Sequence, residues 1–413
     1  MKTQNLSYGL LGESLAHSYS PQIHHLLAPY SYKLFPVPRS ELDTFMTQRR
    51  FLGLNVTIPY KEIVIPYCDT ISPYAQEIGA VNTITVDNRG MLHGYNTDAY
   101  GFTYLCQQSG ISIAGRKVLV LGSGGASKTV TTVLKKMKAS EIIVISRKGP
   151  NTYDTLFRHY DAEIIVNATP VGMYPQNGLV PLCLEPFRSL KGVLELIYNP
   201  LRTALLLDAE ERGIPCANGL PMLTAQAAQA SELFTGKKFS DEIIYNITRS
   251  VETAEQNIIL IGMPGSGKST IGRLLSNEIG RKHLDTDDII EQLSSKSAAE
   301  LLQTEGEESF RNWEAQAVAS ACRESRLVIS TGGGAPLRIE NQRSMRQNGT
   351  VFFLDRHLDA LDRSGRPLSQ SPEVIQNMYK QRLPIYRALS DFQINNDRSP
   401  EDAVRDIRSA LGI

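Results

Sequence analysis

The chain has 413 residues, and its 43 Lys and Arg residues balance 43 Asp and Glu residues, so the formal net charge is zero. This balance excludes the strong basic field typical of proteins that bind nucleic acid or an anionic membrane surface. At roughly 150 residues per domain, the length predicts two or three domains. Hydrophobic residues make up 41% and charged residues 21%, which is ordinary for a soluble globular protein.

Five cysteines are scattered along the chain, and none of them forms a Cys-x-x-Cys pair. Neither a disulfide framework nor a zinc site is therefore expected. The first residues hold no apolar run of the kind found in a signal peptide, and no stretch of about 18 apolar residues predicts a membrane-spanning helix. We expect a cytoplasmic protein that acts on small molecules and has no nucleic-acid or membrane partner. The sequence leaves the oligomeric state open.

Two short apolar runs, residues 117–121 (KVLVL) and 257–261 (NIILI), are each followed by a glycine-rich loop. Each run predicts a buried parallel strand, a turn that holds phosphate groups and then a helix. The predicted fold class is therefore α/β, with two nucleotide-binding units. The two loops differ in kind, so the chain is not an internal repeat. Residues 251–256 (VETAEQ) have no apolar pattern, and we place the domain boundary there.

The first domain is predicted to span residues 1–250 and to combine an α/β substrate-binding part with a Rossmann-like nucleotide-binding part. The second is predicted to be a P-loop kinase domain with a parallel sheet. Residues 223–236 predict a helix that returns to the substrate-binding part, and Gly236 is expected to end it. The expected parts are residues 1–97 with 220–250 for substrate binding, 98–219 for nucleotide binding, and 257–413 for the kinase.

The loop after the first apolar run reads GSGGASK. Gly122, Gly124 and Ser127 fit the G-x-G-x-x-small pattern of a dinucleotide site. In that pattern the glycines allow a tight turn and close approach to a pyrophosphate, and the small residue lets helix and strand pack closely. Gly125 and Ala126 lie in the same loop, where the N–H groups of the following helix face the phosphates.

The strand expected at residues 141–145 (EIIVI) is followed by Ser146, Arg147 and Lys148. An NAD site usually has an acidic residue here, which binds the ribose 2′-hydroxyl. A guanidinium and an ammonium group instead suit a 2′-phosphate. The sequence therefore favours NADP(H) over NAD as the cofactor of the first domain.

Five segments of the first domain place polar side chains at the edges of apolar elements. They are residues 16–21 (AHSYSP), 55–61 (NVTIPYK), 79–83 (GAVNT), 95–98 (YNTD) and 218–228 (NGLPMLTAQAA). Reduction of a ketone needs a proton donor beside the carbonyl that receives hydride, and a Lys with an Asp in one desolvated cleft suits this role. Nearby hydroxyls and amides suit a polyhydroxylated acid.

Together and in this order, the five segments resemble the shikimate dehydrogenase family over residues 7–250. The resemblance implies that Lys61 and Asp98 are the catalytic pair. It implies that Ser18 and Ser20 hold the substrate carboxylate. Further contacts are implied for Thr57, Asn82, Tyr198 and Gln226 with the substrate, and for Gly219 and Met222 with the nicotinamide. Two positions depart from the family's pattern: Ser146-Arg147-Lys148 replaces Asn-Arg-Thr, and Glu195 stands where Asp is expected.

The loop after the second apolar run reads GMPGSGKST, which contains a full P-loop. Lys268 is expected to reach the β- and γ-phosphates of ATP, and Ser269 is expected to bind Mg²⁺. The expected nucleotide contacts of the loop are Gly262, Gly265, Ser266, Gly267, Lys268, Ser269 and Thr270. A P-loop indicates that the phosphate donor is a nucleotide, but it does not indicate which molecule accepts the phosphate.

Five later segments carry evidence about the acceptor. They are residues 285–287 (DTD), 306–314 (GEESFRNWE), 331–334 (TGGG), 366–368 (RPL) and 382–386 (RLPIY). In this order after a P-loop they resemble shikimate kinase over residues 257–413. The resemblance implies that Asp287 holds the acceptor hydroxyls and accepts a proton, and that Asp285 helps to position Mg²⁺.

The same resemblance implies that Arg311 and Arg382 pair with the acceptor carboxylate, a role suited to the guanidinium fork. Gly333 lets the backbone approach the acceptor. Arg366 is expected on a lid that reaches the transferred phosphate. Residues 396–400 (NDRSP), together with Arg363, are expected to contact adenine.

The two resemblances imply a bifunctional enzyme of the shikimate pathway, which leads to chorismate and the aromatic amino acids. It would reduce 3-dehydroshikimate to shikimate with NADPH and then phosphorylate shikimate to shikimate 3-phosphate with ATP. One alternative is an NAD-using quinate/shikimate dehydrogenase joined to another small-metabolite kinase. The second-domain motifs argue against the kinase part of this alternative and leave the dehydrogenase part open. Another is a fusion in which one half is only a regulatory binding module. Retention of Lys61, Asp98 and Lys268 argues against this.

Overall fold

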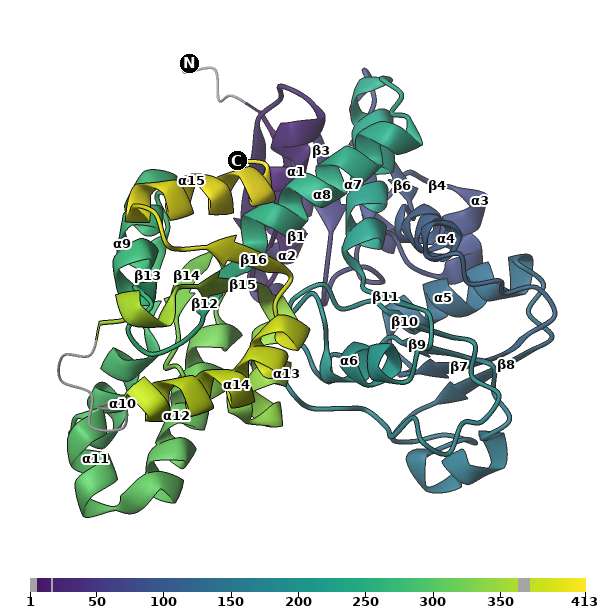
Figure 1. The fold of residues 1–413 in the computed structure, drawn as a ribbon. Helices are drawn as coiled ribbons and strands as arrows, with labels where there is room; N and C mark the ends of the chain where they lie inside the picture. Colours follow the sequence, from purple (N-terminus) through teal and green to yellow (C-terminus); the bar gives the residue numbers. More distant parts are fainter. Residues whose placement is uncertain (1–5, 16–17, 363–371) are drawn as a thin grey trace. The chain divides into compact units, whose positions relative to one another are not determined.

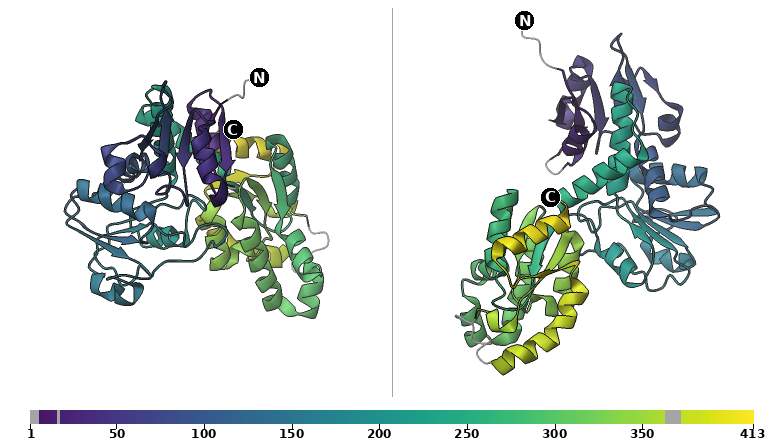
Figure 2. Two further views of the ribbon diagram at one scale, coloured as in Figure 1. Left: turned by 180° about the vertical axis from the view of Figure 1, so that it is seen from behind. Right: turned by 45° about the horizontal axis from the view of Figure 1, so that its top comes forward.

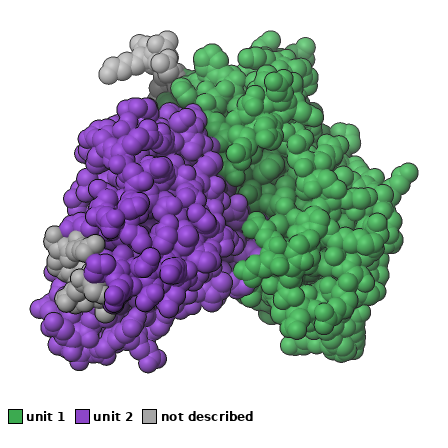
Figure 3. All heavy atoms as spheres, in the orientation of Figure 1, with its two compact units in different colours: residues 1–171, 180–198, 208–252 green, residues 172–179, 199–207, 253–413 purple. Residues whose placement is uncertain are grey.

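The computed structural model describes residues 6–15, 18–362 and 372–413. The chain divides into two compact units, shown in different colours in Figure 3. Unit 1 comprises residues 1–171, 180–198 and 208–252, and unit 2 comprises residues 172–179, 199–207 and 253–413. Within the described ranges, no helix is both long and apolar enough to cross a membrane.

The first sheet of unit 1 is mixed and has the strand order β2-β1-β3-β5-β6-β4. Strand β1 pairs in parallel with β2 and β3, whereas β5 is antiparallel to β3 and β6. The strands are Tyr8–Gly12 (β1), Tyr32–Pro36 (β2), Gly53–Val56 (β3), Thr70–Ile71 (β4), Thr83–Val86 (β5) and Leu92–Tyr95 (β6). Helices Ser20–Leu27 (α1), Leu42–Gln48 (α2) and Pro73–Ile78 (α3) alternate with them. Leu11, Leu54 and Ile84 are fully buried in its core.

The second sheet of unit 1 is entirely parallel, with the strand order β11-β10-β9-β7-β8. Its strands are Lys117–Leu121 (β7), Glu141–Ile145 (β8), Ile164–Asn167 (β9), Gly192–Glu195 (β10) and Cys216–Ala217 (β11). Helices Asp98–Ser109 (α4) and Gly125–Lys136 (α5) accompany it (Figure 1), whereas helix Ala204–Glu211 (α6) includes residues of both units. The strand order reverses between β7 and β9, and in open parallel sheets ligands bind at the carboxyl ends of strands at such a point.

Helix α7 (Leu220–Thr235) confirms the predicted return helix. It ends at Gly236, whose φ of +75° is the left-handed conformation that glycine adopts readily at a helix C-terminus. It packs closely on α4, because a Cβ atom on Gly101 would lie 2.5 Å from the carbonyl oxygen of Met222. Helix α8 (Asp241–Glu255) extends into the segment predicted as the domain boundary, and β12 begins two residues later at Asn257.

Unit 2 contains a parallel sheet with the strand order β13-β14-β12-β15-β16. Its strands are Asn257–Ile261 (β12), Lys282–Asp285 (β13), Leu327–Ser330 (β14), Gly349–Asp355 (β15) and Phe392–Asn395 (β16). Its helices are Lys268–Ile279 (α9), Thr286–Ser294 (α10), Ala298–Thr304 (α11), Gly306–Arg323 (α12), Ile339–Asn348 (α13), Pro372–Leu389 (α14) and Pro400–Leu411 (α15).

Both faces of this sheet are covered, which explains why β12 is a continuous apolar run. Ile258 and Leu260 pack with residues of α9 and α15, two helices that lie side by side in Figures 1 and 2. Ile259 and Ile261 pack on the other face with residues of α12, α13 and α14. The predicted architecture of a substrate-binding α/β part, a Rossmann-like part and a kinase domain with a parallel sheet is confirmed.

Two short segments that come before α8 in the sequence belong to compact unit 2. The N–H of Arg202 donates a hydrogen bond to the carbonyl of Gln347 over 2.8 Å. The hydroxyl of Tyr174 lies 3.2 Å from a carboxylate oxygen of Glu324. Unit 2 is therefore not one continuous stretch of sequence, a feature that no pattern in the sequence indicates.

Candidate active sites

Lys61 and Asp98 meet in unit 1, as the sequence predicts. Lys61 lies in the turn that follows β3, and Asp98 is the first residue of α4. The Lys61 Nζ lies 2.6 Å from Asp98 Oδ2, and the side chains are only 22% and 12% exposed. Two opposite charges held this close and largely out of water orient each other, which is the arrangement that proton transfer needs.

Thr97, the residue before Asp98, belongs to a buried network of hydrogen bonds. Asn82 accepts a hydrogen bond from the Thr97 N–H over 2.6 Å and donates one to Thr97 Oγ1 over 3.0 Å. Thr97 Oγ1 also lies 3.4 Å from Gln226 Oε1. Thr97 therefore connects two predicted substrate ligands, Asn82 and Gln226. The sequence motifs assign it no role, although it stands beside Asp98 in the YNTD segment.

Ser18 and Ser20 lie together at the start of α1, where the Ser20 N–H donates to Ser18 Oγ over 3.2 Å. The residue between them, Tyr19, places its ring 5.1 Å from the ring of Tyr198. Tyr198 comes from the second sheet's part of the unit, so residues of both parts meet here. Thr57 is only partly exposed. Among the described residues, no direct hydrogen bond joins Ser18, Ser20, Thr57 or Tyr198 to Lys61.

The glycine-rich loop after β7 lies at the point where the strand order of its sheet reverses. Gly122 has a φ of +101°, and a Cβ atom there would lie 3.0 Å from the side chain of Thr169, so a side chain would fit poorly. By contrast, open space surrounds the Cβ positions of Gly124 and Gly125. Gly124 precedes α5, and Ser127, in the first turn after Ala126, is buried. The start of this twelve-residue helix therefore has open space beside it, and the free N–H groups of a helix N-terminus suit a phosphate.

The turn after β8 carries the two basic residues that are predicted to bind the 2′-phosphate of the cofactor. Arg147 and Lys148 are both exposed, whereas Ser146 is buried and its hydroxyl donates to the Lys148 carbonyl. The serine thus shapes the turn, and the cationic side chains remain accessible to a ligand.

Gly219 immediately precedes α7, and Met222 lies in the first turn of that helix. A Cβ atom on Gly219 would lie 2.2 Å from the carbonyl oxygen of Leu196, so this position excludes a side chain. Glu195, where the family's pattern has Asp, is fully buried at the end of β10 and accepts a hydrogen bond from Asn167 Nδ2 over 2.9 Å. The longer acid is therefore accommodated inside the sheet.

The P-loop joins β12 to α9 and has the geometry of a phosphate cradle. Gly262, Gly265 and Gly267 have φ values of +150°, +81° and +91°, which glycine adopts without strain. Lys268 is buried, and its Nζ donates to the carbonyls of Gly262 and Met263 over 3.1 and 2.9 Å.

The rest of the P-loop completes a cavity of about 340 Å³. Ser266, a residue of the loop itself, is fully buried. Ser269 Oγ donates to Asp285 Oδ2 over 2.6 Å, so the two predicted metal ligands lie together. The cavity is lined by Pro264, Gly265, Gly267, Lys268, Ser269, Thr270, Arg273, Asp285, Asp287, Thr331, Gly332, Gly333, Arg356 and Asp362.

Asp287 projects into this cavity from the first turn of α10. Its backbone N–H donates to Asp285 Oδ1 over 3.1 Å. Partial desolvation of its carboxyl raises its pKa to about 6, although Asp287 as a whole residue is exposed, and the neighbouring negative charge of Asp285 contributes further. The positive charge of Lys268 acts in the opposite direction. A carboxyl group with a pKa near neutrality suits a group that accepts a proton.

The TGGG loop after β14 lies against residues that are predicted to bind the phosphate acceptor. Each of its three glycines faces a different neighbouring group. A Cβ atom on Gly332 would lie 2.8 Å from a carboxylate oxygen of Glu314 and 3.3 Å from one of Asp287. One on Gly333 would lie 2.7 Å from Pro264 of the P-loop. One on Gly334 would overlap the guanidinium of Arg311.

Two residues to which the sequence motifs assign no role, Glu314 and Tyr386, position this loop. Arg311 Nη1 lies 2.7 Å from an oxygen of Glu314, which is buried with 1% of its side chain exposed. Tyr386 donates to the Gly333 carbonyl over 2.6 Å, and Arg382 Nη1 donates to the same carbonyl over 3.2 Å. Both residues stand in segments that the sequence singles out, Glu314 in FRNWE and Tyr386 in RLPIY. Their places in these segments are the sequence features that could have indicated a role. Arg363 and Arg366 lie outside the described residues.

Comparison with known proteins gives each part of the chain a family. The family model for the shikimate dehydrogenase substrate binding domain matches residues 10–84, and the model for shikimate kinase matches residues 264–411. A shikimate dehydrogenase (NADP(+)) of Clostridium perfringens is 35% identical over 261 residues, which are 58% of this chain and 96% of that protein.

Solved structures agree with this assignment. A chorismate mutase/shikimate 5-dehydrogenase fusion protein from Clostridium acetobutylicum is 37% identical, with a TM-score of 0.57, over 60% of this chain and 98% of its own. A shikimate 5-dehydrogenase from Thermus thermophilus, in complex with NADP(H) and shikimate, is 34% identical, with a TM-score of 0.54, over 59% of this chain and 99% of its own. The chain therefore belongs to the shikimate dehydrogenase family and carries, after its dehydrogenase part, a shikimate kinase domain.

Proposed function

We propose that this protein catalyses two successive reactions of the shikimate pathway. The first is the reduction of 3-dehydroshikimate by NADPH and a proton, which gives shikimate and NADP⁺. The second is the transfer of the γ-phosphoryl group of ATP to shikimate, which gives shikimate 3-phosphate and ADP. The observation that carries the proposal is the presence of two sets of site residues in one chain: the Lys61–Asp98 pair in unit 1, and the P-loop with Asp287 in unit 2.

In the first reaction NADPH supplies the hydride to the ketone. The Lys61 ammonium, held by Asp98 at 2.6 Å, is placed to donate a proton to the carbonyl oxygen. Asn82, Thr97 and Gln226 form a buried amide and hydroxyl network suited to the substrate hydroxyls. Ser18 and Ser20 are assigned to the carboxylate.

The cofactor of the first reaction is assigned to the loop after β7 and the turn after β8. The open space at Gly124 and Gly125 lets the pyrophosphate approach the N–H groups of α5. The exposed Arg147 and Lys148 side chains are available for the ribose 2′-phosphate. Gly219 and Met222, at the start of α7, are assigned to the nicotinamide.

In the second reaction the residues position the reactants and neutralise charge, which are the main tasks in phosphoryl transfer. Lys268 is assigned to the β- and γ-phosphates. Arg311 and Arg382, which meet the TGGG loop, are assigned to the acceptor carboxylate. Asp287 is assigned to the acceptor hydroxyl and its proton.

The residues present fit a magnesium ion. Ser269 Oγ and Asp285 Oδ2 are only 2.6 Å apart, and Mg²⁺ prefers such oxygen ligands while retaining several waters. When bound with ATP, Mg²⁺ neutralises the negative charge on the phosphates. Ser269 and Asp285 would hold it beside the P-loop.

Initial rates measured separately for each half test the proposal. The full chain should oxidise NADPH only with 3-dehydroshikimate, and should form ADP only with shikimate. Quinate with NAD and gluconate with ATP are the comparison substrates. A preference for quinate and NAD, or ATP use with gluconate and none with shikimate, would contradict the proposal for the half concerned.

A further inference from the structure

Arg356 lines the kinase cavity and has no role in the site described above. It is the first residue after β15, and β15 is the parallel neighbour of β12, so it follows the carboxyl end of a strand next to the P-loop. It shares the cavity with Lys268 and Ser269. A half-buried arginine in a phosphate-binding cavity therefore needs an explanation.

The guanidinium of Arg356 lies at one particular side of the P-loop. A Cβ atom on Gly267 would lie 3.5 Å from Arg356 Nη1 and 3.7 Å from Asn396 Nδ2. Asp355 and Asn395 are register partners in neighbouring parallel strands, so Arg356 and Asn396 follow the two strands at the same level. Asn396 begins the segment assigned to adenine. The guanidinium thus lies beside the start of α9, on the nucleoside side of the phosphate cradle.

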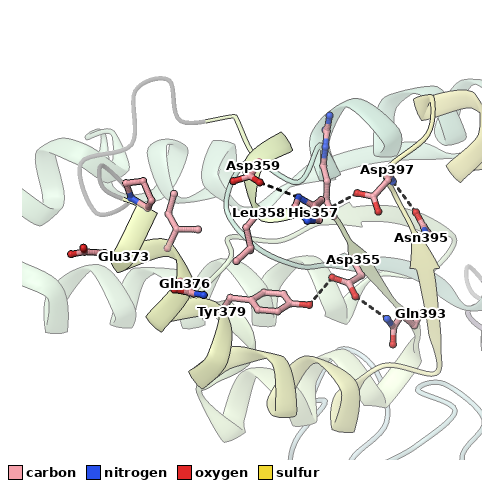
Figure 4. A pocket seen from close by; sticks show the side chains of 13 residues that line it. Asp355, His357, Leu358, Asp359, Glu373, Gln376, Tyr379, Gln393, Asn395 and Asp397 are labelled. Carbon is pink, nitrogen blue, oxygen red and sulfur yellow. Dashed lines mark hydrogen bonds and ion pairs between the residues drawn. The ribbon is translucent and has the colours of Figure 1, made fainter.

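Among the described residues, Arg356 donates no hydrogen bond and forms no ion pair, and its Nε is buried without a partner. The adjacent carboxylate of Asp355 does not neutralise it, because both oxygens of Asp355 are occupied elsewhere. One oxygen accepts a hydrogen bond from the Tyr379 hydroxyl over 3.1 Å, and the other accepts one from the Gln393 amide over 2.9 Å. Figure 4 marks both contacts with dashed lines.

Two further carboxylates near this strand end, those of Asp397 and Asp359, contact His357. Asp397 accepts a hydrogen bond from the backbone N–H of His357 over 2.7 Å. Asp359 lies 3.5 Å from Nδ1 of the same histidine, as Figure 4 shows. Among the described residues, none of these carboxylates forms an ion pair with Arg356, although Asp285, Asp287 and Asp362 line the same cavity.

We propose that Arg356 is a nucleotide-binding residue that holds the α-phosphate of ATP. The inference rests on the proposed kinase function. The start of α9 favours an anion, because its free N–H groups and its dipole point there. Lys268 donates into the loop itself, to the Gly262 and Met263 carbonyls, so the two cations serve different sides of the cradle. The planar guanidinium can bind a phosphate through two parallel hydrogen bonds.

The test uses the full chain with Arg356→Gln and Arg356→Lys, at saturating shikimate. Loss of a charge-assisted contact is expected to raise the KM for MgATP about tenfold to a hundredfold in Arg356→Gln, with Arg356→Lys in between. The KM for shikimate and the dehydrogenase activity of the same preparation should not change. Arg405→Gln, which removes an equally charged side chain exposed by 72% on α15, is the matched control. An unchanged KM for MgATP in Arg356→Gln would overturn the proposal.

A competition experiment separates phosphate binding from stacking on the base. Inorganic tripolyphosphate carries phosphate groups without a nucleoside, so its inhibition constant should also rise in Arg356→Gln. An unchanged inhibition constant would show that Arg356 contacts the base and would overturn the phosphate assignment. If the wild-type chain forms no ADP with shikimate, the proposed function fails. Calorimetric titration of MgADP into wild type and Arg356→Gln still decides whether Arg356 binds nucleotide.

Discussion

Lys61 Nζ and Asp98 Oδ2 lie 2.6 Å apart, although the residues are 37 positions apart in the sequence. The turn after β3 and the start of α4 must both be in place for this contact to form. The pair is thus formed between a turn of the substrate-binding part and the first residue of the helix that leads into the nucleotide-binding part.

Replacement of Lys61 by Met removes the proposed proton donor and should lower kcat for reduction of 3-dehydroshikimate by about 10²- to 10⁴-fold, the usual contribution of general acid catalysis. Shikimate phosphorylation by the same preparation should be unchanged. Lys33→Met, at an exposed position on β2, is the control. Near-normal reduction by Lys61→Met would remove Lys61 from the catalytic pair.

Arg147 should discriminate between the two dinucleotides. Replacing it with Gln removes a charge from the exposed turn after β8, and the dissociation constant for NADPH should rise about tenfold to a hundredfold. Binding of NADH, which has no 2′-phosphate, should change little. Fluorescence titration with both cofactors measures this, with Arg188→Gln as a control at another exposed position. An equal loss for both cofactors would show that Arg147 does not bind the 2′-phosphate.

Chelation of divalent metal should abolish phosphorylation and leave reduction intact, because Ser269 and Asp285 belong only to the kinase site. Asp285→Asn should raise the Mg²⁺ concentration that gives half-maximal kinase activity. Asp288→Asn, in the first turn of the helix that Asp285 caps, is the matched control. A Mg²⁺ dependence that is the same in Asp285→Asn and wild type would assign Asp285 a different role.

Arg311 should act on the acceptor and not on ATP. Its guanidinium touches the TGGG loop at Gly334, so Arg311→Gln should raise the KM for shikimate and leave the KM for MgATP nearly unchanged. An unchanged KM for MgATP would also show that the kinase domain of the variant remains folded. Arg311→Lys retains the charge beside Glu314, so its KM for shikimate should fall between the values of wild type and Arg311→Gln. Arg323→Gln, at an exposed position on the same helix, should resemble wild type. A loss confined to ATP affinity would contradict the assignment.

The sequence predicts local elements of this fold well. The strands expected at residues 117–121, 141–145 and 257–261 have these bounds in the structure, because each is a continuous apolar run in a parallel sheet. The helix end at Gly236 is also correct, since a left-handed C-terminal residue is a local feature.

Features that depend on contacts between distant residues could not be read from the sequence. Thr97 links Asn82 to Gln226 through a hydrogen bond to a residue 129 positions away. Arg356 becomes notable only because the carboxylates around it have other partners. The inclusion of residues 172–179 and 199–207 in unit 2 likewise depends on tertiary packing.

A single coupled assay tests the central claim, that one chain carries out both reactions in sequence. The full chain receives 3-dehydroshikimate, NADPH and MgATP, and shikimate 3-phosphate is measured by mass spectrometry. We expect its formation to be accompanied by equimolar NADPH oxidation and ADP release. Lys268→Met should oxidise NADPH and accumulate shikimate, whereas Lys61→Met should form shikimate 3-phosphate only when shikimate is supplied. Failure of the wild-type chain to form shikimate 3-phosphate from 3-dehydroshikimate, with both cofactors present, would contradict the account.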